Sequence, residues 1–233
     1  MVTHHALPGS EHREGYQAGA ASVFRWFRDE LAALEKTQAQ AANRDPYELL
    51  NEMVASVPAG ARGLLVLPYF ASATSPRWNP FARGTITGLT FAHDRSCLAR
   101  AFMEGITLEV KDMLLSLLAS GIEISEVHIL GGPTRSGIWN QIQADMYNRP
   151  VKTLKNADAA VLGAAILAGV GAKHFRDVRE GAARMVKVDK VYQPEAKSAG
   201  IYDRLYDIYC LAYEGLQESG VFQKLSELQQ TIA

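Results

Sequence analysis

Apolar residues recur at helical spacing in the first part of the chain. Between Gln17 and Leu34 they fall three or four residues apart, which predicts one amphipathic helix. A second helix is predicted over RDPYELLNEMVASVP, because Asp45 can cap it, Pro46 suits its first turn and Pro58 follows its end. The chain is therefore expected to open with helices.

The centre of the chain alternates between short apolar runs and longer amphipathic stretches. Strands are predicted over 63–70, 84–91, 123–132 and 149–154, with a weaker one over 190–194. Helices are predicted over 95–120 (ended by Gly121), 136–147 and 157–168, and from Ser198 onward. This alternation predicts an α/β fold, with helices packed on a central sheet and helical segments at both ends.

Composition excludes several classes of protein. The 233 residues include 24 basic and 25 acidic ones without long basic runs, which disfavours a nucleic-acid surface. No run reaches the 18 apolar residues of a membrane span, and the N-terminus lacks the apolar core of a secretory signal. We therefore expect a cytoplasmic protein without a membrane contact.

The residues that most often bind metals form no spacing typical of a metal site. Cys97 and Cys210 lie far apart in apolar helical patterns, which favours buried thiols over a disulfide or a metal pair. His4, His5 and His12 lie in a polar leader, where solvated side chains are the usual outcome. Neither a metal site nor a set of catalytic residues is predicted, because no Ser-His-Asp, Cys-His, HExxH or paired-acid arrangement is present.

One turn has a composition that suits ligand binding. The strand over 123–132 ends in Gly131-Gly132, and Pro133-Thr134-Arg135-Ser136 leads into the next helix. Two missing Cβ atoms beside a helix N-terminus would let an anion or a polar ligand edge reach the backbone. Glycines selected only for tight packing explain the same pattern. The turn matches neither GxGxxG nor GxxxxGK[ST], and no acidic residue follows at the distance expected of a dinucleotide-binding site.

Two further segments stand out. The helix over 157–168 carries Gly163 and several alanines on one face and Asp158 in its first turn. Such a face is typical of a tight helix crossing or of a hinge between two lobes. The loop that contains Trp78, Asn79 and Arg83 lacks periodicity, so it is either an ordered functional loop or a satellite core anchored by Trp78.

Five segments in fixed order carry a family resemblance. They are GAASVFRWFRDEL, LLVLPYF with SPRWNPFARGTITGLT, LARAFMEGITLEV, ILGGPTRSGIWNQIQADMYNRPV and DAAVLGAAILAGVG. Together, over about residues 7 to 220, they resemble the C-terminal domain of the FGGY carbohydrate kinases, which include xylulokinase, glycerol kinase and gluconate kinase. Three positions depart from the family: Ser72-Ala73-Thr74 replaces a frequent Gly-Glu-Arg, Asn79 an Asp, and Asp158 a Glu.

The resemblance implies an actin-like ATPase domain of the ribonuclease H type, spanning residues 1–233 as the nucleotide-side half of a sugar kinase. It implies that ATP, with Mg²⁺, binds in a cleft between two domains. The nucleotide-binding residues it implies are Gly131, Gly132, Pro133 and Ser136, together with Ala92 and Ser96. It places Asp158 and Gly163 on the face of an interdomain hinge.

Length is the largest departure, because family members are about twice as long. The resemblance places the catalytic Asp, the phosphate loops and most sugar contacts in an N-terminal domain that this sequence does not contain. We therefore expect this chain alone to be inactive in phosphoryl transfer to a pentose, hexose or polyol. A non-catalytic nucleotide-binding or assembly module derived from such a kinase is the alternative. Self-association through the small-residue helix over 157–168 is also expected.

Overall fold

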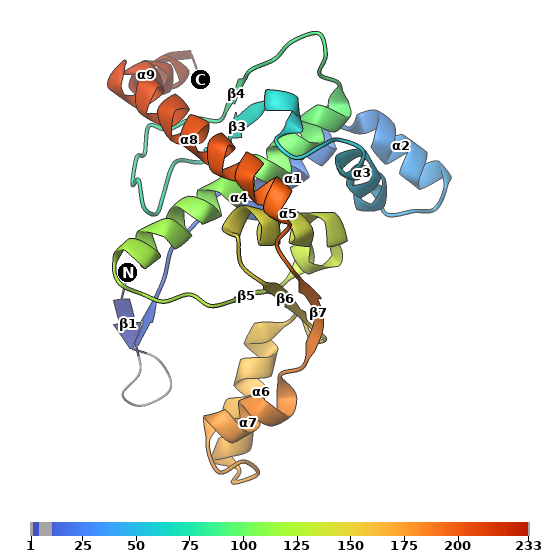
Figure 1. Ribbon diagram of the computed structural model, residues 1–233, viewed down its shortest axis with the longest axis vertical. Helices are drawn as coiled ribbons and strands as arrows, with labels where there is room; N and C mark the ends of the chain where they lie inside the picture. Colours follow the sequence, from blue (N-terminus) through green and yellow to red (C-terminus); the bar gives the residue numbers. More distant parts are fainter. Residues whose placement is uncertain (1, 5–10, 233) are drawn as a thin grey trace.

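A single long helix, α4 (Arg95–Ala119), runs through the middle of the molecule, and three other helices and one strand pack against it (Figure 1). The computed structural model describes residues 2–4 and 11–232. The Asp94 side chain caps α4 by accepting a hydrogen bond from the Cys97 amide at 3.0 Å. Gly121 follows the helix with φ +84°, as the sequence predicted.

The N-terminal helices cover one side of α4. They are α1 (Ala20–Trp26), a π-helical turn (Phe27–Leu31), α2 (Ala33–Ala41) and α3 (Pro46–Ala55). The single helix predicted over 17–34 is therefore interrupted, because Ala32 leaves helical geometry at φ −114°, ψ 38°. The predicted cap of α3 is confirmed, since Asp45 accepts a hydrogen bond from the Tyr47 amide at 2.9 Å.

The described strands form three separate groups. Strands β1 (Val2–His4) and β2 (Glu11–Arg13) pair antiparallel, as do β3 (Leu65–Leu67) and β4 (Thr85–Thr87). A mixed sheet contains β5 (Val127–Ile129), β6 (Val151–Leu154) and β7 (Val188–Tyr192), with β5 parallel and β7 antiparallel to β6. Every predicted strand is present, although the sheet is divided. The polar pair β1–β2 was not predicted, because it lacks an apolar pattern.

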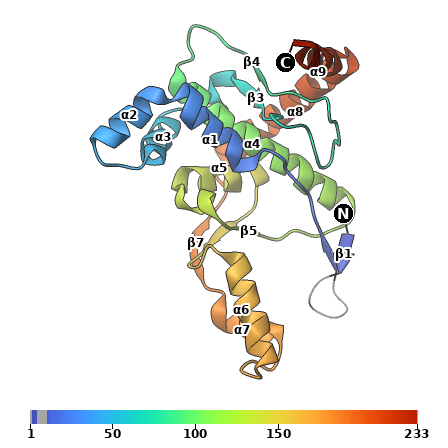
Figure 2. The ribbon, with the colours of Figure 1, turned by 180° about the vertical axis from the view of Figure 1, so that it is seen from behind.

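The remaining helices lie at the two ends of the molecule and beneath α4. Helix α5 (Gly137–Tyr147) packs between α4 and α8 (Ala196–Glu218), and α9 (Val221–Ile232) follows α8. Helix α6 (Ala159–Gly171) and the unpredicted α7 (Val178–Met185) form a hairpin that projects from the mixed sheet, far from α9 (Figures 1 and 2). The α/β class with helical ends is thus confirmed.

The structure shows the burial and contacts of the two cysteines and of the loop at Trp78 and Asn79. Cys97 is buried, Cys210 is half-buried, and both thiols are free. Trp78 is 63% exposed, so it is not a core anchor. Asn79 instead holds its loop in place, because its side-chain amide donates a hydrogen bond to the Tyr213 hydroxyl at 3.1 Å.

Helix α4 lies very close to strand β3 at Gly105. A Cβ atom added at this glycine would lie 2.4 Å from the backbone oxygen of Val66 in β3. Real Cβ atoms do not approach a carbonyl oxygen so closely, so only glycine allows α4 to lie against β3 here.

Gly105→Ala is therefore expected to lower the free energy of unfolding by about 3 kcal/mol, because helix and strand must separate. The measurement is urea denaturation followed by circular dichroism. Gly163→Ala, inside the helix at 159–171, is the matched control: an added Cβ there has no atom of the described chain within 4 Å, so the better helix propensity should raise stability by up to about 1 kcal/mol. Equal effects of the two substitutions would contradict the packing argument.

Buried charged side chains of α4 are paired, mainly with α8. Arg100 bonds Glu104 at 2.7 Å, and the Tyr202 hydroxyl contacts both side chains at 2.9 Å. Further along, Asp112 accepts hydrogen bonds from Arg77 at 2.7 Å and from the Tyr206 hydroxyl at 2.6 Å. These contacts compensate groups that would be costly to bury alone, although the second carboxylate oxygen of Glu104 is buried without a hydrogen-bond partner.

Glu109 is the buried acid of α4 with the least charge compensation. Its carboxylate accepts a hydrogen bond from the Gln17 amide at 2.7 Å, while Asp112 lies near enough to oppose its ionisation and Arg77 to favour it. Burial outweighs the favourable contacts and raises the pKa of Glu109 to about 7.

The raised pKa predicts that stability falls as pH rises from about 4.5 to about 7. In this window the unfolded carboxyl has lost its proton while the folded one retains it, so the loss reaches up to about 3 kcal/mol. Glu109→Gln should flatten this part of the pH profile, measured by urea denaturation between pH 4.5 and 8. Exposed Glu30→Gln is the control, and a profile unchanged by Glu109→Gln would refute the assignment.

Candidate functional site

The Gly131-Gly132 turn lies at the carboxyl ends of the parallel strands β5 and β6. Gly131 has φ +80°, ψ −161°, a backbone conformation open only to glycine. Its amide donates a hydrogen bond to the Ala157 oxygen at 3.1 Å, which ties the turn to the segment that leads from β6 into α6. Ligands of open α/β sheets bind at this edge, beyond the carboxyl ends of the strands.

Gly132 distinguishes between the two explanations of the glycine-rich turn, which are ligand binding and tight packing within the chain. It is exposed, it has no positive φ, and a Cβ atom added to it would have no atom of the described chain within 4 Å. Neither backbone geometry nor packing inside this chain therefore requires glycine here. An exposed backbone without a side chain suits contact with a group from outside the chain, such as the flat face of a base.

Side chains from two helices hold the turn in shape. Ser136 caps α5 by accepting a hydrogen bond from the Trp139 amide at 3.2 Å, and its hydroxyl donates to Asn51 of α3 at 2.7 Å. Pro133 is half-buried in a 3-10 turn (Gly132–Arg135), and the Asn140 amide donates to the Thr134 oxygen at 2.9 Å. The turn is thus preorganised before any ligand arrives.

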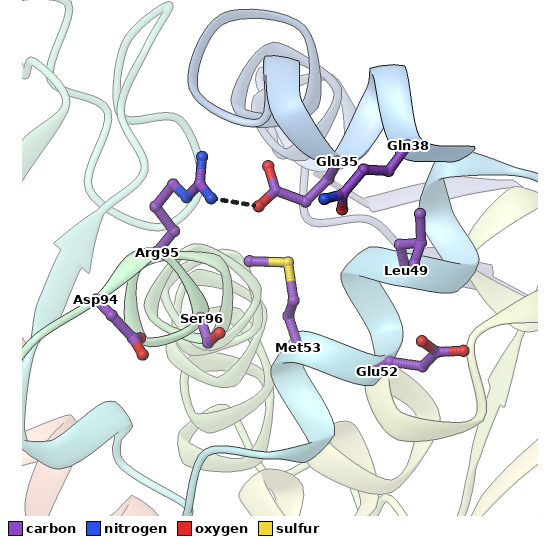
Figure 3. Close-up of a pocket in the computed structure, with 8 residues that line it drawn as sticks. All are labelled: Glu35, Gln38, Leu49, Glu52, Met53, Asp94, Arg95 and Ser96. Atoms are coloured by element: carbon purple, nitrogen blue, oxygen red, sulfur yellow. Dashed lines mark ion pairs between the residues drawn. The ribbon is translucent and has the colours of Figure 1, made fainter. Parts of the chain in front are cut away.

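Ser96, which was predicted to bind the nucleotide together with Ala92, lines a cavity of about 290 Å³ (Figure 3). The cavity lies between α2, α3 and the start of α4, and its lining includes neither Ala92 nor the turn. Ala92 is exposed in the loop before α4. The structure therefore does not gather Ala92 and Ser96 with Gly131, Gly132, Pro133 and Ser136 into one cavity.

Charged groups dominate the cavity at Ser96. Arg95 bonds Glu35 at 3.0 Å, and the second carboxylate oxygen of Glu35 is buried without a hydrogen-bond partner (Figure 3). Asp94 lies at its rim, where the Cys97 amide lowers the pKa of the carboxyl by hydrogen bonding to the ionised form. A carboxylate-rich lining is poorly suited to a phosphate group.

The two predicted hinge residues lie on the projecting helix α6. Asp158 precedes the first turn and caps it, because its side chain accepts a hydrogen bond from the Val161 amide at 3.1 Å. An added Cβ at Gly163 has no atom of the described chain within 4 Å. Within the described residues, no other helix therefore crosses α6 tightly at this position. The close contact forms elsewhere, where Gly169 and Gly181 leave room for Phe175.

Two asparagines that support the turn, Asn51 and Asn140, were not predicted from the sequence. Asn51 holds Ser136 across 85 positions of sequence, and no local pattern could have connected the two. Asn140 is fully buried, and its side-chain oxygen lacks a partner. A polar amide one helical turn after Ser136, which leads into the helix, was the available signal.

Residues 2–4 and 11–232 were also searched for metal-binding clusters and for membrane-spanning helices. No group of three or more His, Cys, Asp or Glu side chains there could hold a metal ion. His5 and the side chain of His4 lie outside the described residues. The helices described include none with both the length and the apolar character needed to cross a membrane.

Comparisons with known proteins agree on one family. Residues 2–172 match the model of the FGGY family of carbohydrate kinases, C-terminal domain. The chain is 30% identical over 210 residues to the xylulose kinase of Staphylococcus epidermidis, covering 90% of this chain and 40% of that protein. It is 32% identical over 188 residues to the gluconokinase of Bacillus subtilis, covering 80% and 36%.

Structural comparison gives the same result. The crystal structure of xylulose kinase from Rhodospirillum rubrum superimposes with a TM-score of 0.82 and 32% identity, covering 95% of this chain and 43% of that one. The actin-like fold expected from the five segments is thereby confirmed, and the chain spans about two fifths of the length of these relatives. This chain belongs to the FGGY family of carbohydrate kinases and corresponds to its C-terminal domain.

Proposed function

We propose that this chain is the C-terminal half of an ATP-dependent carbohydrate kinase and forms the adenosine side of its nucleotide site. The observation that carries the proposal is Gly132, a glycine that this chain's own backbone and packing do not require. It lies at the sheet edge where α/β proteins bind ligands, in a domain related to sugar kinases.

The residues of the turn have distinct roles in this proposal. Gly131 bends the chain at the end of β5, and Gly132 and Pro133 offer a flat surface to adenosine. Ser136 positions that surface through its bonds to α5 and to Asn51. The proposal is confined to this turn, because the lining of the cavity at Ser96 does not include it. The nucleotide contacts of Ala92 and Ser96 stay predictions.

Phosphoryl transfer would require groups from a companion domain. The reaction needs a positioned sugar hydroxyl, a base, clamped phosphates and Mg²⁺, and the described residues offer no cluster of metal ligands. ATP would supply the phosphoryl group once both domains close around it. Asp158 and Gly163 would then lie on the hinge, where the exposed face of α6 meets the companion domain. The free thiols of Cys97 and Cys210 fit a reducing compartment, so we place the reaction in the cytoplasm.

The first prediction concerns activity. This chain alone should form no ADP from ATP and Mg²⁺ with xylulose, gluconate or glycerol, because it provides only one wall of the site. Adding the separately produced N-terminal domain of the Staphylococcus epidermidis xylulose kinase should give sugar-dependent ADP formation in a coupled assay.

Turnover by the chain alone would contradict the proposal. Persistent inactivity with N-terminal domains from several relatives, although each binds the chain, would favour a non-catalytic nucleotide-binding or assembly module. The N-terminal domain without this chain is the necessary blank.

The second prediction concerns the turn. Gly132→Ala should leave the melting temperature of the chain nearly unchanged, because the added methyl group meets open space. In the reconstituted assembly it should weaken ADP binding about tenfold or more, since the methyl group intrudes on the base. Isothermal titration calorimetry measures the affinity.

Gly171→Ala at the end of α6 is the matched control, because that position is equally open within the chain. It should change neither stability nor ADP affinity appreciably. If Gly132→Ala left the ADP affinity unchanged, the proposal that the turn contacts the nucleotide would be wrong.

A further inference from the structure

The outer face of α8 is uncovered along its whole length. The helix buries Ala199, Tyr202, Leu205, Tyr209 and Tyr213 against the body of the molecule. The opposite side of the helix faces solvent, as its position on the surface in Figure 1 shows. This exposed side is named the outer face and consists of Lys197, Gly200, Arg204, Asp207, Ile208, Leu211, Glu214, Gly215 and Glu218.

Two apolar side chains, Ile208 and Leu211, lie near the centre of the outer face beside Asp207, and a glycine lies on either side of them. Ile208 and Leu211 are 52% and 66% exposed. Gly200 and Gly215 lie on either side of them, and an added Cβ at either glycine has no atom of the described chain within 4 Å. Two glycines in an exposed helix allow the backbone of a second element to approach closely.

Charge is divided between the two halves of the outer face. Lys197 and Arg204 lie in the N-terminal half, while Glu214 and Glu218 lie in the C-terminal half. None of these four side chains forms an ion pair within the described chain. Asp207, near the middle, is within one helical turn of either half.

The pattern is self-complementary when the helix is reversed. Lys197 and Glu218 are equally distant from the point between Asp207 and Ile208, and so are Gly200 and Gly215. Two antiparallel copies centred on that point would place each Lys197 opposite a Glu218 and each Gly200 opposite a Gly215. Arg204 would lie opposite Leu211, within one turn of Glu214. Each favourable pairing occurs twice, as in a two-fold symmetric interface.

We propose that two copies of this chain associate through the outer faces of α8, packed antiparallel about the point between Asp207 and Ile208. The glycines let the helices approach, Ile208 and Leu211 form the apolar centre, and the charged ends set the antiparallel direction. This surface differs from the small-residue face of α6, where self-association was expected from the sequence.

The test is sedimentation equilibrium of the 233-residue chain over a wide concentration range. The average mass should rise towards twice that of the monomer. Gly200→Leu and Gly215→Leu should each raise the dissociation constant of the dimer about tenfold or more. Both should keep or improve the melting temperature, because both positions are exposed and an added Cβ atom there has no atom of the described chain within 4 Å. A folding defect therefore cannot explain lost association.

Two controls make the assignment specific. Gly163→Leu on α6 should leave the dissociation constant unchanged. Lys197→Glu and Glu218→Lys should each weaken association, and the double substitution should restore it, because both contacts regain opposite charges.

Three results would overturn the proposal. The wild-type chain could remain monomeric throughout the concentration range. Association could be lost in Gly163→Leu and kept in Gly200→Leu, which would assign it to α6. The charge reversals could fail to compensate, which would exclude the antiparallel register.

Discussion

The approach of α4 to β3 at Gly105 is the contact on which the rest of the structure depends. With Val66 O 2.4 Å from where a Cβ atom would lie, the helix can lie this close to the strand only because residue 105 is glycine. Helices α1, α3 and α5 then pack against α4 from other sides. A displacement of α4 would therefore be transmitted to every one of these helices, because close-packed interiors transmit strain.

The same helix, α4, also positions the candidate site, because the helices that hold the site pack against it. Trp139 of α5 donates a hydrogen bond from its ring nitrogen to the Thr107 hydroxyl of α4 at 3.0 Å, and α3 contacts α4 on another side. Ser136 and Asn51 then join α5 to α3 directly above the Gly131-Gly132 turn. A rigid scaffold of three helices thus holds a turn whose own backbone faces solvent, which is the arrangement that favours binding with little reorganisation.

The surfaces proposed to contact a ligand or a partner share one property. Each carries glycines that the packing of the described chain does not require. Gly132, the α6 face at Gly163 and the α8 face at Gly200 and Gly215 all have open space where a side chain could stand. Glycine in an exposed helix costs up to about 1 kcal/mol relative to alanine.

Local pattern determined most elements of this protein, because helix caps, strand-length apolar runs and C-terminal glycines act over a few residues. Asp45 caps its helix and Gly121 follows the end of α4, as the sequence predicted, and five ordered segments identified the family. The β1–β2 pair, α7 and the break at Ala32 had no such signal. The partner of Ser136, the separation of Ser96 from the turn and the open space around Gly132 were decided by tertiary structure alone, because each depends on which distant segments pack together.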